Sequence, residues 1–334
     1  MKVSRGLRRA RDGVTALLAS HLGRRPRQFA WMLQAVRLVP LDHVRARLYR
    51  GFSWPLVQAT DVRLIVSTRG GRMEVDTGDT VGGVVAVSGI WEPNATAVVV
   101  RLLRPGDVFV DLGAHTGYYT LLAADLVGTA GHVFAFEPSP ARYRELLANL
   151  ERSGKKNVSA FERAAGSGDG TATLYDAPRP NTSASTLSTG ALAFPAVGTA
   201  ADYRPVTVEV VAAESMLPAD LLGRVRVVKV DVEGYEREAI HGIEQILGIG
   251  APLTVLVEVS PRWSGEGSAW VERLCARHRL EPWLVENAYT VAGYFPVRPR
   301  PPRPLASIPA ERCDLLLVRA FDPAVVAGAR GGAS

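Results

Sequence analysis

Four short, mainly apolar segments of this 334-residue chain each end in a carboxylate. They are Val108–Asp111, Val133–Glu137, Val227–Asp231 and Val255–Glu258. Runs rich in Val and Phe with a charge at the far end are typical of buried parallel strands, whose carboxyl ends line a ligand-binding crevice. The four carboxylates therefore predict the edge of the sheet at which the chemistry takes place.

Segments with a helical spacing of apolar residues separate these strands. In chain order we expect strand 108–111, helix 117–127, strand 132–137, helix 139–151, strand 157–162, strands near 171–175 and 206–212, helix 213–222, strand 225–231, helix 235–247, strand 253–259, helix 267–278 and late strands at 282–291 and 313–319. Strand-helix alternation at this spacing requires right-handed crossovers. The chain is therefore predicted to be an α/β protein with a doubly wound sheet.

The segments outside this alternation divide the chain further. We expect a basic helical extension at 1–60, an antiparallel β entry segment at 61–95, the α/β domain at 96–320 and a flexible tail at 321–334. The entry segment rests on two β-type runs, Val62–Val66 and Gly83–Val87, which turn residues separate.

The positive charge of the chain is concentrated at its N-terminus. Residues 1–50 contain twelve Arg and Lys against Asp12 and Asp42, so they carry +10, whereas the rest of the chain carries −4. Such an arm could make weak contact with an anionic membrane surface, with nucleic acid or with an acidic partner, although a solvated helical surface is the plainer interpretation. These amphipathic residues could also pack on the body or on a second subunit, giving a homodimer.

The cysteine content and the apolar stretches bear on the compartment. Cys275 and Cys313 are the two cysteines, and their spacing supports neither a disulfide framework nor a metal site. No apolar stretch reaches the ~20 residues needed to span a bilayer. Gly13–Ala19 imitates a signal peptide but is short and runs into basic residues. We therefore expect a cytoplasmic protein.

A glycine-containing turn, Asp111–Gly117, lies between a predicted strand and a predicted helix. A helix N-terminus at this place offers unpaired backbone N–H groups and a positive dipole end. The G-x-x-x-G spacing departs from the dinucleotide fingerprint, because Ala114 and His115 stand where a pyrophosphate would need another glycine. NAD is therefore disfavoured. S-adenosylmethionine has no pyrophosphate, and its carboxylate and ammonium can use the turn amides and a strand-end carboxylate.

Glu137 is the second feature of the predicted cofactor site. It follows Gly117 by twenty residues, at the end of the second strand, where an acidic side chain would accept hydrogen bonds from both ribose hydroxyls. The alternative is that Glu137 caps the next helix. The candidate cofactor-binding residues are Asp111, Gly113, Ala114, His115, Thr116, Gly117, Glu137 and Pro138.

Several ordered blocks of the sequence resemble the FkbM family of S-adenosylmethionine-dependent methyltransferases. The blocks are Gly89-Ile90-Trp91-Glu92-Pro93, Pro105–Thr120, Ala135-Phe136-Glu137-Pro138, Lys229–Glu236 and Glu258-Val259. The resemblance covers roughly 85–260. It implies a class I methyltransferase fold, which is Rossmann-like with a mostly parallel seven-stranded sheet, and O-methylation of a hydroxyl on a small molecule or glycan, such as a secondary metabolite or a sugar of a glycolipid.

The acceptor proton is the chemical difficulty in such a reaction. Ionising an alcohol of pKa ~16 at neutral pH would cost roughly 12 kcal/mol, so a general base or a divalent metal is needed. Asp231, at the end of the fourth strand, is the first candidate for the catalytic base, and Glu233 follows in the turn. The alternative is that they cap the next helix. Asp231 and Glu258 end adjacent strands and could instead share a Mg²⁺ ion.

Two other functions compete with this one. Methylation of RNA is suggested by the basic arm, but the chain has Asp-Val-Glu-Gly where amino-group methyltransferases place an Asn-Pro-Pro-Tyr motif, so nucleic acid is disfavoured as acceptor. The other is a non-catalytic module that binds S-adenosylmethionine and docks a partner through residues 1–50 and the Pro-rich segment 299–304. The acceptor itself depends on variable loops, here 176–204 and 292–310, and residues 166–203 form a candidate lid whose centre, 181–186, is too polar to be core.

Overall fold

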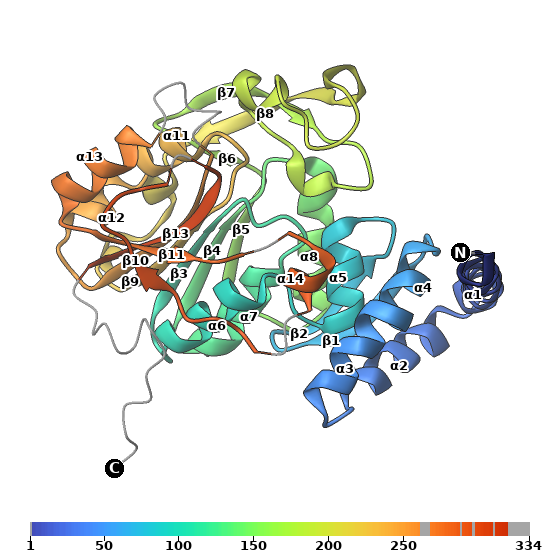
Figure 1. Cartoon of the computed structure of the whole chain (residues 1–334). Helices are drawn as coiled ribbons and strands as arrows, with labels where there is room; N and C mark the ends of the chain where they lie inside the picture. The colour runs from blue at the N-terminus through green and yellow to red at the C-terminus, as the bar shows by residue number, and fades with distance from the viewer. Residues whose placement is uncertain (1, 261–267, 288, 296–297, 310, 320–334) are drawn as a thin grey trace, which may run out of the picture.

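An eight-stranded sheet with helices on both faces lies at the centre of the computed structural model (Figure 1). From edge to edge its strands are β12 (Arg303–Pro304), β11 (Glu281–Val285), β13 (Cys313–Arg319), β10 (Leu253–Val259), β9 (Val225–Val230), β3 (Val108–Leu112), β4 (His132–Phe136) and β5 (Val158–Phe161). Strands β10, β9, β3, β4 and β5 are parallel, and β13 is antiparallel to β10 and β11. The predicted mostly parallel α/β sheet is confirmed, and β12 adds two residues to its edge.

The structure describes residues 2–260, 268–287, 289–295, 298–309 and 311–319, so the predicted tail at 321–334 lies outside the described residues. Both faces of the sheet are buried, since successive side chains of a strand point to opposite faces. Val108 and Val110 belong to the apolar cluster on one face, whereas Phe109 belongs to the cluster on the other. This explains why the central strands read as continuous apolar runs.

Different helices cover the two faces. On the face that contains Phe109, the helices are α5 (Thr80–Ser88), α6 (Pro93–Leu102), α7 (Tyr118–Val127) and α8 (Pro140–Arg152). On the other they are α11 (Glu236–His241), α12 (Glu244–Gly248) and α13 (Ala269–His278). The expected single helix 235–247 is thus two helices. Gly242 lies at the break, where a Cβ atom would stand 2.1 Å from the carbonyl oxygen of Gly166.

The entry segment is only half β-structure. Strands β1 (Arg63–Thr68) and β2 (Gly71–Asp76) form an antiparallel hairpin. The expected strand Gly83–Val87 lies instead in helix α5, so that prediction is wrong. The side chain of Asp79 caps the helix by accepting hydrogen bonds from two backbone N–H groups, and Gly89 ends it with a φ of 77°. Because residues 81–87 are all buried, their apolar run had no alternation to separate helix from strand.

Smaller elements complete the chain. A three-stranded sheet contains β6 (Ala164–Ala165), β7 (Gly170–Asp176) and β8 (Arg204–Val211). The connection between β7 and β8 contains η2 (Thr182–Ala184), α9 (Thr189–Leu192) and η3 (Ala200–Asp202). The expected helix 213–222 consists of η4 (Ala213–Met216) and α10 (Ala219–Leu222), with Pro218 between them. The expected strand 282–291 ends at Val285, and α14 (Val291–Tyr294) follows.

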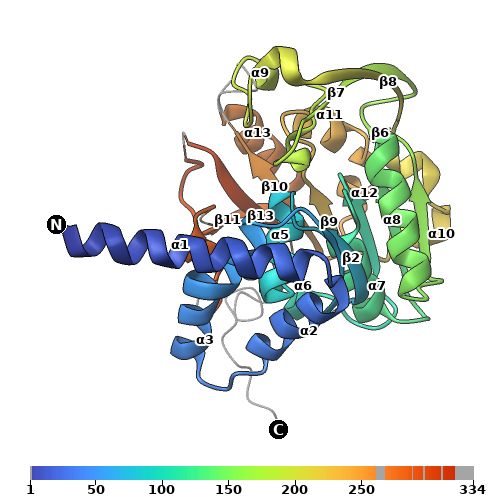
Figure 2. The same cartoon turned by 90° about the vertical axis from the view of Figure 1, so that its right-hand side faces the viewer.

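The first sixty residues are helical and pack against the hairpin and α5. Their elements are α1 (Lys2–Gly23), α2 (Pro26–Arg37), α3 (Asp42–Leu48), η1 (Tyr49–Ser53) and α4 (Trp54–Gln58). Figure 2 shows α1 crossing this side of the molecule and extending beyond the body. Arg37 fixes the layer, because its guanidinium donates hydrogen bonds of 2.6–3.2 Å to the carbonyl oxygens of Ser67, Val85, Ala86 and Val87.

Within the described residues, no single helix is both long and apolar enough to cross a membrane. Helices α5 and α6 reach that length and hydropathy only as a pair bent by 69°.

We predict that Arg37→Met destabilises the fold. Burial lowers the pKa of Arg37 to about 10, so the guanidinium is charged at neutral pH. Its removal takes away the donor that the carbonyl groups of Ala86 and Val87 use, whereas that of Val85 keeps the amide of Gly89. The free energy of unfolding, measured by urea denaturation, should fall by ~2–4 kcal/mol. The exposed Arg47 offers a matched control, and Arg47→Met should change the value by less than ~0.5 kcal/mol. Equal stability of the two variants would contradict the anchoring role.

Candidate active site

Two cavities meet at the carboxyl ends of β3 and β9. The first, called here the Trp91 cavity, is lined among others by Trp91, Glu92, Lys229, Glu258, Tyr289 and Arg312. The second, called here the Glu137 cavity, is lined among others by Glu137, Pro138, Ala164, Ala165, Leu174 and Leu187. Both are lined by Gly113, His115, Ser183, Asp231 and Glu233. The predicted edge of the sheet is therefore the place where the cavities join.

The turn Asp111–Gly117 has the glycine-dependent geometry expected of it. Gly113 and Gly117 have φ values of 84° and 94°, which disfavour other residues. A Cβ atom on Gly113 would stand 1.9 Å from the carbonyl oxygen of Asp231, and one on Gly117 would stand 2.6 Å from Cδ1 of Leu146. The glycines thus let the turn lie directly against the strand that carries Asp231.

The backbone amides of this turn are used within the protein. Those of Gly113 and Ala114 both donate to the carbonyl oxygen of Phe136, at 3.0 Å, and that of Gly117 donates to Ala114. The amide of His115 donates to Oε2 of Glu137 at 2.7 Å. The expectation that a cofactor carboxylate would use the turn amides is therefore wrong for these four groups. These hydrogen bonds within the protein fix the turn, and the fixed turn holds its side chains in position.

Asp111 has a free buried oxygen. Its Oδ2 accepts a 2.6 Å hydrogen bond from Oγ1 of Thr120, whereas Oδ1 is buried and has no hydrogen-bond partner among the described residues. Burial raises the pKa of Asp111, although the charge of Lys229 opposes this. Since Asp111 lines the Trp91 cavity, an ammonium group of a ligand would satisfy the orphaned oxygen. This observation fits S-adenosylmethionine.

Glu137 follows β4 and accepts hydrogen bonds from two backbone amides, one of them at the start of α8, as the capping alternative expected. Its Oε1 accepts a 2.8 Å hydrogen bond from the amide of Ser139, which caps α8, and its Oε2 accepts that of His115. Each oxygen keeps a lone pair that a ribose hydroxyl could use. Burial raises the pKa of Glu137 to about 7. Glu137 and the apolar side chains that line its cavity, such as Ala164 and Leu174, together fit a nucleoside.

His115 has no charge to offer at neutral pH. Burial lowers its pKa to about 4, and its Nε2 lies 3.2 Å from Oγ1 of Thr182. Thr116 Oγ1 lies 3.4 Å from the other ring nitrogen. These contacts favour a role for His115 in holding the loops around the cavities.

The candidate lid is anchored to the entry segment. The amide and the hydroxyl of Thr182 both donate to Oδ2 of Asp79, at 2.9 and 2.6 Å. Arg179 forms ion pairs with Asp61 and Asp76. Thr182 and Thr186 are buried, so the view that 181–186 is too polar for the interior is wrong, since carboxylate and carbonyl acceptors satisfy these hydroxyls.

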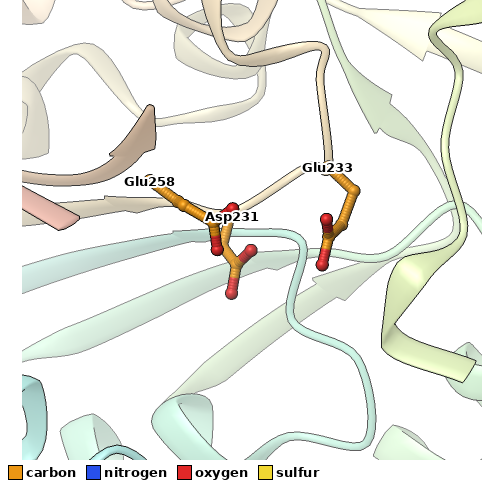
Figure 3. A group of neighbouring side chains, drawn as sticks. All are labelled: Asp231, Glu233 and Glu258. Carbon is orange, nitrogen blue, oxygen red and sulfur yellow. The ribbon is translucent and has the colours of Figure 1, made fainter. Parts of the chain in front are cut away.

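The carboxylates of Asp231, Glu233 and Glu258 converge where the cavities join (Figure 3). One oxygen of each lies within 4.8 Å of the others. Two cations stand beside them. The Nζ atom of Lys229 lies 2.8 Å from Asp231, and Arg312 lies 2.5 and 2.7 Å from the two oxygens of Glu258 and 3.9 Å from Glu233. The adjacency of Asp231 and Glu258 expected from the strand order is thereby confirmed.

The three carboxylates differ in their affinity for protons. Burial acts to raise the pKa of Asp231, but the ammonium of Lys229 outweighs it, and the pKa lies below its ordinary value. Burial and the neighbouring charge of Glu258 raise the pKa of Glu233 well above its usual range. Burial raises the pKa of Glu258 to about 7, although the positive charge of Arg312 acts to lower it. Of these carboxyl groups, Asp231 therefore gives up its proton most readily, whereas the environment of Glu233 favours its protonated form.

Several further residues of the Trp91 cavity were not assigned a role from the sequence, among them Glu92, Lys229, Tyr289 and Arg312. Glu92 accepts 2.9 Å hydrogen bonds from the hydroxyls of Tyr119 and Tyr289. Lys229 is a buried charged residue of β9 that stands two residues before Asp231, a signal that could have identified it. Arg312 has no such signal, because it reaches the site from the segment before β13.

Comparisons with known proteins agree with this geometry. A family model described as the methyltransferase FkbM domain matches residues 111–290. The hexuronic acid methyltransferase AglP of Haloferax volcanii is 26% identical over 153 residues, which are 45% of this chain and 56% of that protein. A protein-L-isoaspartate O-methyltransferase of Methanothrix thermoacetophila is 36% identical over 84 residues, which are 25% of this chain and 38% of that protein. The match thus spans little more than half of the length of the first relative and less than half of that of the second.

A solved structure of a similar protein is that of methyltransferase FkbM from Methylobacillus flagellatus. It has 12% sequence identity and a TM-score of 0.39, and the match covers 71% of this chain and 53% of that one. An S-adenosylmethionine-dependent O-methyltransferase from Thermotoga maritima has 15% identity and a TM-score of 0.36, with 69% and 66% covered.

We predict that affinity for S-adenosylmethionine increases with pH through the titration of Glu137. Because the pKa of the free carboxyl is about 7 and ribose hydroxyls donate to the ionised form, binding releases a proton. The Kd measured by isothermal titration should be about tenfold lower at about pH 8 than at about pH 6. Glu137→Gln should weaken binding and remove this dependence, whereas Glu162→Gln, at an exposed site, should retain it. A dependence that persists in Glu137→Gln would contradict the assignment.

Proposed function

The chain belongs to the FkbM methyltransferase family and is an S-adenosylmethionine-dependent methyltransferase, and on this premise we propose that it O-methylates a hydroxyl group of a sugar. The observation that carries the proposal is the position of Asp231. Its carboxylate lines both the Glu137 cavity, which fits the nucleoside of the donor, and the Trp91 cavity, which fits the acceptor. A base at that junction can act on the hydroxyl that faces the methyl group.

The residues of the turn and of β4 would hold the donor. Asp111 would accept hydrogen bonds from the ammonium, and Glu137 would accept them from the two ribose hydroxyls. S-adenosylmethionine supplies a methyl group on a sulfonium, which leaves as a neutral thioether when the methyl is displaced in line. Such a displacement gains most from positioning, so the rigid contact between Gly113 and the backbone of Asp231 is expected to matter for rate.

The lining of the Trp91 cavity supports a sugar as acceptor. Trp91 lies beside two tyrosines, with ring centroids 5.8 Å from Tyr294 and 6.5 Å from Tyr289. Aromatic faces pack against the C–H faces of a pyranose, and the carboxylates and hydroxyls nearby can bind its hydroxyl groups. The similarity to a hexuronic acid methyltransferase supports the same class of acceptor. Arg312 could pair with an acidic group on such a sugar.

Asp231 is proposed as the general base. It would accept a hydrogen bond from the acceptor hydroxyl and take its proton as the new C–O bond forms, so that no free alkoxide arises. Lys229 keeps the Asp231 carboxylate ionised. Glu233, whose raised pKa favours the protonated form, would donate a hydrogen bond to the sugar and fix its orientation.

A divalent cation is the second candidate, since the oxygens of Asp231, Glu233 and Glu258 converge within 4.8 Å and are ligands that Mg²⁺ prefers. The charges favour the metal-free reaction. Lys229 and Arg312 already compensate Asp231 and Glu258, and each would have to move for the carboxylate to coordinate a metal.

We predict that Asp231→Asn lowers kcat by at least ~10²-fold, because the amide cannot take the proton. The Kd for S-adenosylmethionine should stay within about threefold, since Asp111 and Glu137, the proposed hydrogen-bond acceptors for the donor, are unchanged. Single-turnover methyl transfer and isothermal titration measure the two effects. Retained turnover would remove Asp231 as the base. If wild-type activity survives EDTA and is not raised by Mg²⁺, Asp231 acts as a base and not as a metal ligand.

The acceptor class is tested with methyl-labelled S-adenosylmethionine and a panel of neutral hexosides, hexuronic acids and their non-glycosylated carriers. We expect a methyl ether on a sugar hydroxyl, identified by mass spectrometry of the released sugar. Trp91→Ala should raise KM for that sugar about tenfold or more through the loss of aromatic packing while leaving donor affinity unchanged. Labelling of RNA or of protein carboxyl groups, with no labelled sugar, would contradict the proposal.

A further inference from the structure

The outer surface of the N-terminal helices exposes large apolar side chains. We call Val14, Leu17, Leu18, Trp31, Leu38 and Leu41 the N-terminal surface. Leu17 and Trp31 are each 73% exposed and Leu38 is 83% exposed. Of the remaining exposed large apolar residues of the described chain, Phe52 lies in η1 of the same layer, and the others are spread over later elements, such as Leu147 on α8 and Ile249 after α12. So many solvated apolar groups in one short segment indicate an interaction site.

These side chains face away from the protein core. On α1, Val14, Leu17 and Leu18 have the spacing of one helix face, whereas the buried Ala19 lies on another. Helices α1, α2 and α3 lie together on the side that faces the viewer in Figure 2, and the N-terminal part of α1 projects past the body. No described part of the chain covers this outer face of α1.

Helix α2 repeats the pattern and adds charge. Trp31 and Leu38 follow Arg27 by four and eleven residues, a spacing that places all three on one stripe of the helix. Phe29 and Leu33 are fully buried on its opposite side. The exposed stripe therefore combines an indole, an aliphatic side chain and a guanidinium, the amphipathic composition that favours a membrane interface.

The helices and connections that carry the N-terminal surface also carry exposed arginines. Exposed arginines of this layer are Arg24, Arg25, Arg27, Arg47 and Arg50. Among the described side chains none of these five forms an ion pair, and Asp42, an acid of this layer, is paired with Arg45. The surface is therefore both apolar and strongly positive.

We propose that the N-terminal surface docks the enzyme onto an anionic membrane. Insertion of Trp31, Leu17 and Leu38 at the level of the headgroups would bury their apolar area, and the arginines would pair with lipid phosphates. A second copy of the chain is a poorer occupant, because its own N-terminal residues would bring a like charge of +10 against this surface. A nucleic acid would pair with the arginines but would leave the aliphatic side chains in water.

The inner side of the same helical layer touches the wall of the Trp91 cavity. The ring of Trp54, on α4, lies 6.1 Å from that of Tyr294, and Tyr49 lies 5.4 Å from Phe295. Docking would therefore hold the acceptor cavity close to the bilayer. The docking inference does not depend on the sugar acceptor of the proposed function, but together they point to an acceptor that is carried on a lipid.

The test is flotation of the full chain with vesicles of phosphatidylcholine alone or with one quarter phosphatidylglycerol. We expect binding to the anionic vesicles, reduced by high salt, and little binding to the neutral ones. The triple variant Leu17→Ser, Trp31→Ser, Leu38→Ser should bind anionic vesicles at least about tenfold more weakly than the natural chain. The matched control, Leu147→Ser with Ile249→Ser, removes exposed apolar residues elsewhere and should bind like the natural chain.

Titration with S-adenosylmethionine shows that each variant is folded, because none of these residues lines either cavity. Absence of binding to anionic vesicles, or equal binding by the triple variant, would overturn the proposal. So would a dimer of the natural chain that the triple variant loses, or salt-sensitive binding to RNA in place of vesicles. Each of these outcomes leaves the methyl-transfer assay intact, so failure of docking and failure of the proposed function are separate results.

Discussion

The ion pair between Lys229 and Asp231 is the interaction on which the electrostatics of the site depend. Lys229 is 4% exposed, and its ammonium lies 2.8 Å from Asp231 and 5.0 Å from the centroid of the Tyr119 ring. Burial acts to lower the pKa of Lys229, but the charges of Asp231, Asp111 and Glu92 raise it above its ordinary value. One buried cation thus keeps Asp231 ionised among carboxyl groups that burial drives toward protonation.

A second constraint is that distant parts of the chain share single side chains. Asp79 caps α5 through Oδ1 and holds Thr182 of the candidate lid through Oδ2. Glu92 ends the segment before α6 and receives the hydroxyl of Tyr289 from the C-terminal part of the chain. The cavities are therefore complete only when the N-terminal, central and C-terminal segments are all folded.

The main elements of the sheet and the edge at which the two cavities join could be predicted because strands buried on both faces leave a strong pattern. Asp231 and Glu258 end neighbouring strands, so their proximity follows from strand order. Lys229 stands two residues before Asp231 on the same face of a strand, a signal present in the sequence that was not used. Arg312 could not be found, since the antiparallel insertion of β13 between β11 and β10 decides where it lies. The helix at Gly83–Val87 could not be recognised because its burial on all sides leaves no periodicity.

The absence of a side chain at Gly113 has a consequence for how such an enzyme can diversify. Because the turn Asp111–Gly117 lies against the backbone of Asp231, the turn and the residues that follow β9 behave as one unit, and a change in either disturbs both. The aromatic wall of the Trp91 cavity comes from other segments, around Trp91 and between Tyr289 and Tyr294. On the proposed function, acceptor preference can therefore change by substitution in those segments while the contact between the turn and Asp231 is kept.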